Sequence, residues 1–262
     1  MVLRLVWTDL KPLRSLLLVS VAAVALTACA TSPMTTGGIG DGGQADQPLD
    51  RKQAALQQLA AHYKKSPDDK ATIVYYAAAL RANGQIDQAV AVLEAGVARY
   101  RNDPEILVGY AKALSAAGRF DQALNVVDRA INPASPDWNA LMVKGAILDQ
   151  SGRNKEARVA YVQALKIAPD QASLHANLGL SYAMTNELDK AESELQMAVK
   201  LRGSNSQVRQ NLALVIGLQG RFDESRALFA AELPASQVEA NMAYIKALLT
   251  QQNRWDLIKG AG

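Results

Sequence analysis

The feature that most constrains the fold of this chain is a turn-forming residue that returns every 34 positions. The tetrapeptide Gly-Arg-Phe-Asp begins at Gly118 and again at Gly220, and these positions differ by 102, which is three times 34. Equal steps of this size place five residues in one column: Gly84, Gly118, Gly152, Asn186 and Gly220. Glycine and asparagine accept a left-handed backbone at low cost. The column therefore predicts the same tight turn made five times.

Further columns keep this spacing and predict a helix on each side of the turn. Five residues after the turn, every residue is small, as a close crossing of two helices requires: Ala89, Ala123, Ala157, Ala191 and Ser225. Fifteen residues before the turn lies a column of mostly helix-capping residues: Asp69, Asp103, Asp137, Gln171 and Asn205. An Asp or Asn side chain at such a position accepts hydrogen bonds from the free amides of the first helical turn.

A 34-residue unit of cap, helix, turn and helix resembles the tetratricopeptide repeat. The family's small eighth position is matched by Ala77, Ala111, Gly145, Gly179 and Ala213, and its late proline by Pro67 and Pro169. Three residues depart from the family pattern, namely Lys144, His175 and Glu232. The resemblance implies an all-α fold, a right-handed superhelical solenoid of about five repeats plus capping helices.

The repeat register also predicts boundaries. Residues 70–237 hold the five repeats, and residues 50–69 form an N-terminal capping helix. At the other end, Asn253-Arg254-Trp255-Asp256 echoes Gly-Arg-Phe-Asp one position earlier than a full repeat after Gly220, so residues 238–262 are predicted to form an imperfect C-terminal capping repeat. Caps are needed because a terminal repeat cannot bury its own apolar face.

The N-terminus resembles a bacterial lipoprotein signal. Basic residues precede an apolar run from Leu16 to Ala28, which is shorter than the roughly 20 residues of a membrane-spanning helix. Such a segment is typical of an export signal, the alternative being an anchor helix that stays attached. Leu26-Thr27-Ala28-Cys29 resembles the lipobox. The resemblance implies that residues 1–28 are a removed signal peptide and that Cys29, the only cysteine, is lipidated.

Residues 29–49 are rich in glycine and are predicted to form a flexible tether between the lipid and the folded part. In lipoproteins an aspartate directly after the cysteine often marks retention in the inner membrane, and Ala30 and Thr31 stand there instead. This resemblance implies a lipid anchor at the periplasmic face of the outer membrane. An inner-membrane lipoprotein remains the alternative.

Composition argues against several functions. The net charge is +3, and no basic stripe with interleaved aromatic residues is present, so we expect no nucleic-acid binding. The chain has one cysteine and two histidines, and it lacks the spacings of zinc, phosphate-loop and serine-hydrolase motifs. We therefore predict no catalytic residue, metal site, cofactor or small-molecule substrate, and we interpret His175 as a structural histidine.

In tetratricopeptide proteins the first helix of each repeat lines a concave face, which here is mostly apolar. The resemblance predicts a groove for a helix or an extended peptide of a partner protein, although some of its residues pack between repeats instead. The groove residues are Tyr75, Val108, Met142, Val143, Asn177, Leu180, Met184, Asn211, Leu214, Leu218 and Tyr244. Asn177 and Asn211 resemble the amide pair with which some of these modules hold a carboxylate, but the accompanying basic residues are mostly missing.

The last third of the chain resembles the TadD-like tetratricopeptide lipoproteins of the tight-adherence (Flp/Tad) pilus system. The resemblance rests on the Asn-Leu-Ala-Leu segment at Asn211, the turn at Gly220, the Leu-Pro break at Leu233 and the Ala-Asn-Met-Ala-Tyr segment at Ala240. It implies an outer-membrane scaffold for protein–protein interactions in pilus biogenesis and secretion. Its expected partners are the secretin, whose assembly or localisation it would assist, or other pilus-assembly components.

Two other functions are compatible with a tetratricopeptide lipoprotein. One is an adaptor for cell-wall hydrolases or proteases, which predicts a cell-shape phenotype. The other is an assembly factor for outer-membrane barrels, which predicts a general loss of barrel proteins, whereas the pilus function predicts loss of pili alone.

Overall fold

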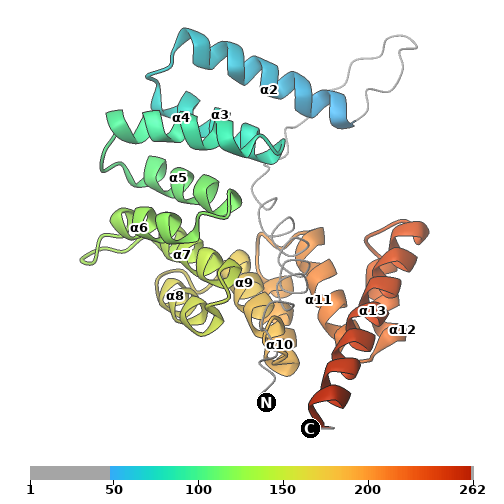
Figure 1. The fold of residues 1–262 in the computed structure, drawn as a ribbon. Helices are drawn as coiled ribbons and strands as arrows, with labels where there is room; N and C mark the ends of the chain where they lie inside the picture. Colours follow the sequence, from blue (N-terminus) through green and yellow to red (C-terminus); the bar gives the residue numbers. More distant parts are fainter. Residues whose placement is uncertain (1–47, 261–262) are drawn as a thin grey trace, which may run out of the picture. The chain divides into compact units, whose positions relative to one another are not determined.

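The computed structural model describes residues 48–260, and in this range it contains twelve α-helices and no strand (Figure 1). The expected all-α fold is therefore confirmed. The chain divides into two compact units, with the boundary between Arg153 and Asn154. We call residues 48–153 the N-terminal unit and residues 154–260 the C-terminal unit. The boundary falls at the turn inside the third predicted repeat.

In the N-terminal unit each helix packs on the next one in the chain, and the first helices of successive repeats, α3, α5 and α7, also pack on one another. The helices are α2 (Pro48–Lys65), α3 (Lys70–Ala82), α4 (Ile86–Arg99), α5 (Pro104–Ala116), α6 (Phe120–Ala130) and α7 (Trp138–Gln150). Helix α2 packs on α3, the place that the sequence predicted for a capping helix.

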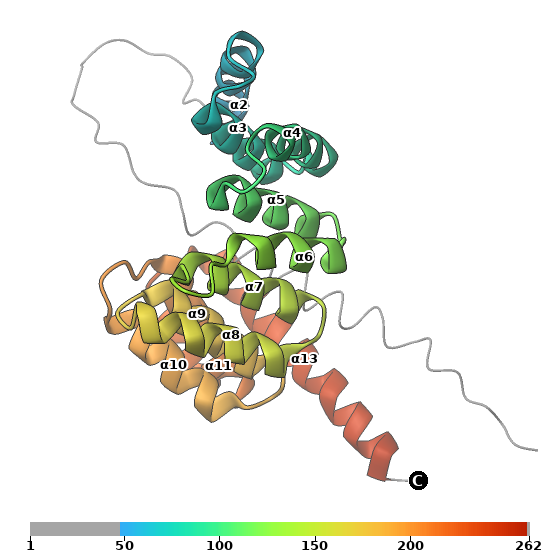
Figure 2. The same cartoon turned by 90° about the vertical axis from the view of Figure 1, so that its left-hand side faces the viewer.

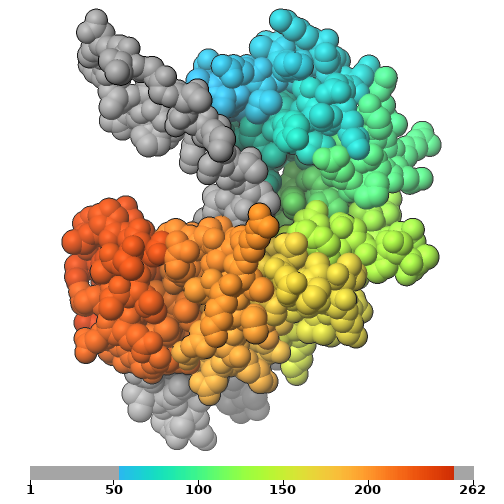
Figure 3. Space-filling model, turned by 180° about the vertical axis from the view of Figure 1, so that it is seen from behind, coloured from blue at the N-terminus to red at the C-terminus, as the bar shows by residue number. Residues whose placement is uncertain are grey.

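The C-terminal unit repeats this arrangement, with α9, α11 and α13 packed in a row and the helices between them packed on their chain neighbours (Figure 1). Its helices are α8 (Asn154–Ile167), α9 (Ala172–Ala183), α10 (Leu188–Lys200), α11 (Ser206–Leu218), α12 (Phe222–Ala230) and α13 (Ala235–Gly260). Side chains close the gaps between neighbouring helices in the space-filling view (Figure 3).

All five predicted turns have the left-handed backbone. The φ angles are 74° at Gly84, 73° at Gly118, 81° at Gly152, 61° at Asn186 and 86° at Gly220. The residue after each turn donates its amide hydrogen to the carbonyl five residues earlier, for example Arg119 to Leu114 at 2.9 Å. This bond is the one that closes a helix C-terminus in the Schellman motif.

The predicted caps form at four of five repeats. The side chains of Asp69, Asp103, Asp137 and Asn205 accept hydrogen bonds from amides two or three residues later. Gln171 stands at the fifth cap position, and its longer side chain makes no such bond. The short Asp and Asn side chains cap because they reach their own following amides without extra torsions.

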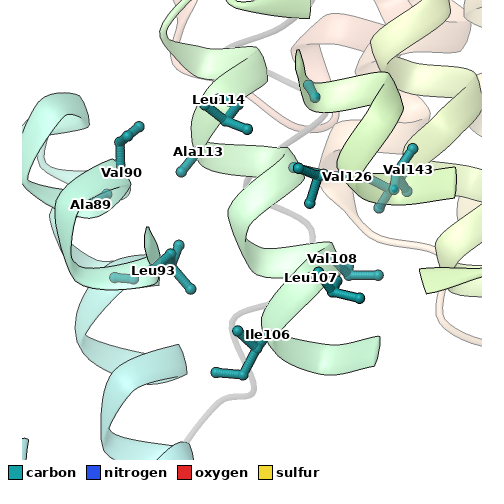
Figure 4. Packing of buried hydrophobic residues seen from close by; sticks show 14 of the residues in the cluster. Ala89, Val90, Leu93, Ile106, Leu107, Val108, Ala113, Leu114, Val126 and Val143 are labelled. Atoms are coloured by element: carbon teal, nitrogen blue, oxygen red, sulfur yellow. The ribbon is translucent and has the colours of Figure 1, made fainter. Parts of the chain in front are cut away.

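The small-residue columns lie where helices touch. Ala89, Ala123, Ala157, Ala191 and Ser225 are all fully buried. Ser225 differs from the alanines by one hydroxyl, which donates a 2.7 Å hydrogen bond to the carbonyl of Ala213. In the N-terminal unit the core continues from α4 through α5 to α6 and α7, where Leu93, Ile106, Leu114 and Val126 lie between the helices (Figure 4).

The end of the chain differs from the expectation. Residues 235–260 form one continuous helix, so the turn expected at Asn253 is not present. Asn253 stands one position short of a full repeat after Gly220, so it does not fall in the column that holds Asn186 and the turn glycines. None of the helices in the described range is long and apolar enough to cross a membrane. Cys29 and the apolar run before it lie outside the described residues.

Candidate partner-binding surfaces

Two of the predicted groove residues of the N-terminal unit are accessible. Tyr75 on α3 is 63% exposed, and Met142 on α7 is half-buried. Val108 and Val143 are only 6% and 4% exposed, because they belong to the hydrophobic core of this unit. These two valines hold helices together and offer no surface to a partner.

In the C-terminal unit the groove residues lie on the packed helices α9, α11 and α13 or at their ends. Asn177, Met184, Leu214, Leu218 and Tyr244 are half-buried, so each keeps some side-chain surface in contact with solvent. Leu214 and Leu218 rest on a cluster formed by Phe229, Met242 and other buried residues. The surface is therefore apolar and is supported from below by a packed core.

Leu180 and Asn211 are more buried than expected, with 5% and 6% exposure. The Asn211 side-chain oxygen accepts a 3.2 Å hydrogen bond from Gln207. Both residues therefore offer little side-chain area to a partner, and Met184 and Leu214 are the more accessible positions. Asn211 is buried and already bonded, so its burial, together with the missing basic residues, argues against a carboxylate clamp formed with Asn177.

Helices α9 and α11 contain no lysine, aspartate or glutamate. Their two groups that can carry charge, His175 and Arg209, are both engaged by neighbours. The face formed by these helices is therefore close to electrically neutral, and it suits an uncharged apolar segment better than a charged one.

Each departure from the family pattern has a partner in a neighbouring segment. Lys144 pairs with Asp128 at 2.8 Å. The two ring nitrogens of His175 lie 2.7 Å from Glu194 and 3.0 Å from the carbonyl of Pro169. His175 is thus held by two acceptors, as expected for a structural histidine.

Glu232 is bound by Arg209 through two hydrogen bonds, of 2.5 and 3.1 Å. The bonds from Arg209, together with one from Ser206, lower the pKa of the Glu232 carboxyl. This pair links the segment after α12 to α11. An ion pair therefore stands where the family usually has an alanine contact.

One cluster that sequence reasoning missed surrounds Tyr182 at the end of α9. The Arg158 guanidinium lies 4.8 Å and the Lys190 ammonium 5.3 Å from the centre of its ring. Both cations also contact Glu187 at 2.8 Å. Hydrogen bonds from Lys190 and Thr185 lower the pKa of Glu187 from 4.5 to about 2.

The cluster joins α8, α9 and α10, so it fixes consecutive helices rather than a ligand. Two departures from the repeat pattern could have indicated it. Tyr182 is aromatic, whereas the equivalent residues of the other repeats are Leu or Ile. Glu187 is acidic, whereas three of the equivalent residues are arginine. A second such network joins the Arg221 guanidinium to Glu192 on α10 at 2.8 Å and to Glu224. Within the described residues no group of His, Cys, Asp and Glu is arranged to hold a metal ion.

Comparison with protein families identifies the repeat. A tetratricopeptide repeat family matches residues 51–107 and 80–145, and a second family of the same repeat matches residues 145–186. Together these matches span more than half of the 262 residues. The comparison with curated proteins gives no match.

Solved structures share the fold at low sequence identity. A thermophilic tetratricopeptide protein from Thermus thermophilus is similar with a TM-score of 0.56 and 23% identity, over 75% of this chain and 99% of that one. A tetratricopeptide repeat protein from Parabacteroides merdae gives a TM-score of 0.57 and 16% identity, over 79% and 84% of the two chains. Cut9–Hcn1 of the APC/C gives 0.60 and 15%, over 80% of this chain and 41% of that one. At these identities the likeness shows the fold alone.

Proposed function

We propose, from the premise that this chain belongs to the tetratricopeptide repeat family, that it is a lipid-anchored scaffold in the assembly of a tight-adherence (Flp/Tad) pilus. The repeats indicate a protein-binding scaffold. The finer proposal is that the chain is held at the periplasmic face of the outer membrane by lipid on Cys29 and assists the assembly or localisation of the secretin.

The observation that carries the scaffold function is the apolar face of α9, α11 and α13, to which α9 and α11 contribute little charge. Met184, Leu214, Leu218 and Tyr244 are partly exposed there, and Leu214 and Leu218 pack against a buried hydrophobic cluster. When a partner helix or peptide covers such a face, the binding free energy comes mainly from the apolar area that is removed from water. Because the supporting helices are already packed, little ordering of the scaffold is needed on binding.

The pilus assignment is supported by the sequence resemblance of the C-terminal segments. In the structure these segments are α11, which begins at Ser206 and contains Asn-Leu-Ala-Leu, the left-handed turn at Gly220, and the break at Leu233 between α12 and α13. The anchor is supported by the lipobox-like residues before Cys29 and by the position of the only cysteine.

The experiment that tests the function is photo-crosslinking in living cells from Met184, which is half-buried and therefore reachable. Leu180 is the poorer position because it is buried. The matched control is Ala230 on α12, which is exposed and lies outside this face. The captured protein is identified by mass spectrometry in cells that assemble pili.

Capture of the secretin or another pilus component from Met184, and not from Ala230, supports the proposal. Capture of a cell-wall hydrolase, a protease or a barrel-assembly protein keeps the scaffold and replaces the pilus role. Equal capture from both positions contradicts the assignment of this face as the binding surface.

A further inference from the structure

Exposed apolar side chains are concentrated on two helices of the C-terminal unit. Over the described residues, five large apolar side chains are exposed, and four of them lie on α8 and α10. These four are Val159, Val162, Ile167 and Met197, with exposures from 43% to 59%. None of them belongs to the binding face formed by α9, α11 and α13.

The cations that lack an ion pair gather on the same helices and the loop after α10. Most described cations of the C-terminal unit are engaged: Arg158, Lys190, Arg209, Arg221 and Arg226 in ion pairs, and Lys246 over the ring of Phe222. Lys155, Lys166, Lys200 and Arg202 are exposed, and within the described range they have no such partner. Of these, Lys166, Lys200 and Arg202 lie at the C-terminal ends of α8 and α10, beside Ile167 and Met197.

The repeat register relates some of these side chains on α8 and α10, and Met197 stands one position after the equivalent of Val162. Lys166 and Lys200 are separated by one full repeat and therefore occupy equivalent positions on α8 and α10, both of which pack on α9. Along α8, Val159, Val162 and Lys166 follow at spacings of three and four, which is one face of a helix. Both helices can be followed in Figure 2. We call the surface formed by Val159, Val162, Lys166, Ile167, Met197 and Lys200 the basic apolar face.

The equivalent helices of the N-terminal unit carry different residues. At the position of Val162, α4 has Glu94 and α6 has Asp128. At the position equivalent to Ile167 two repeats earlier, α4 has Arg99. Charged residues there give an ordinary solvated surface, so the apolar residues of α8 are a local property and do not follow from the repeat.

We propose that the basic apolar face lies against an anionic phospholipid surface. Aliphatic side chains at this exposure enter the headgroup region, and unpaired lysines beside them are attracted by anionic lipid. The face has single aliphatic side chains and flexible lysines without an aromatic anchor, and it therefore suits a soft charged surface better than the pocketed surface of a protein partner. This inference rests in part on the proposed anchor: the 18 residues from 30 to 47 reach at most about 65 Å, which limits the distance of the folded part from the bilayer.

The test uses the purified full-length mature protein with benzoylphenylalanine in place of Met197, mixed with vesicles of phosphatidylethanolamine and phosphatidylglycerol. After irradiation, mass spectrometry measures the phospholipid adduct. The matched control places the same group at Ala240, an exposed residue of α13. Vesicles of phosphatidylcholine alone test the need for negative charge.

We expect a phospholipid adduct from position 197 with anionic vesicles, little from position 240, and little with phosphatidylcholine. The double substitution Lys166→Gln and Lys200→Gln should weaken the response roughly 25-fold, since each lysine contributes about a fivefold gain in affinity near such a surface. Equal adducts from both positions, or an unchanged response in the double variant, would overturn the proposal. An adduct with a protein from an added periplasmic extract, in place of lipid, would also overturn it.

Failure of the anchor can be separated from failure of this face. The mass of the N-terminal peptide reports acylation of Cys29 independently of the adduct. An unacylated Cys29 with a lipid adduct at position 197 refutes the anchor and supports the face. An acylated Cys29 without the adduct supports the anchor and refutes the face.

Discussion

Substituting the turn glycine Gly118 tests whether the register of the repeat is set by backbone conformation. Its φ angle is 73°, and a Cβ atom built there meets nothing within 4 Å. Steric clash is therefore excluded, and the cost of Gly118→Ala is that of the left-handed conformation, about 1 kcal/mol. Asparagine tolerates this conformation better, as Asn186 does with a φ of 61° in the equivalent turn.

We expect Gly118→Ala to lower the urea midpoint by about 0.5 M for an m value of about 2 kcal/mol per molar, and Gly118→Asn to lower it by less than half as much. The assay is urea unfolding followed by far-ultraviolet circular dichroism. The reciprocal control is Asn186, where glycine should retain stability and alanine should reduce it. A wild-type midpoint for Gly118→Ala, or a lower one for asparagine than for alanine, would refute the reasoning.

Four further predictions follow from packing, charge and the anchor. Gly179→Ala should destabilise by up to about 2 kcal/mol because its Cβ would lie 2.9 Å from Leu195, although better helix propensity offsets part of the cost; thermal unfolding measures the change. Ala123→Glu should destabilise by several kcal/mol by placing a charge at a fully buried contact, and a wild-type melting temperature would contradict this. The pKa of Glu187 is about 2 in the folded chain and 4.5 without its neighbours. The loss of unfolding free energy in Glu187→Gln should therefore be largest above pH 4.5 and disappear as the pH falls toward 2, which urea unfolding at several pH values checks. Cys29→Ser should leave an uncleaved or soluble chain, seen by membrane fractionation, and an unchanged membrane fraction would remove the anchor.

The repeat register predicted those features that a single backbone or packing requirement controls. The turn at Gly84, the cap at Asp103 and the buried contact at Ala123 each allow few residue types, so the same types recur at the interval of the repeat. Their positions and roles were therefore readable from the sequence alone.

The candidate site was less predictable because exposure depends on small rotations of a helix. Successive helical residues differ by about 100° in direction, so Val143 lies in the core while its neighbour Met142 remains accessible. The ion cluster around Tyr182 was also not predicted, since it joins Arg158 and Glu187 from different segments. The charges that meet between helices depend on side-chain reach, which the spacing of the repeat does not fix.

Each helix of a unit packs on its neighbours in the chain or on the next but one. This local packing determines how each unit responds to a pulling force. A pulling force applied to one end of such a unit loads the outermost helix pair first, and that pair can detach while the helices beyond it keep their contacts. Extension should therefore occur as a series of small force steps rather than one large rupture. A scaffold of this kind would yield gradually under load and re-form in the reverse order when the load is removed.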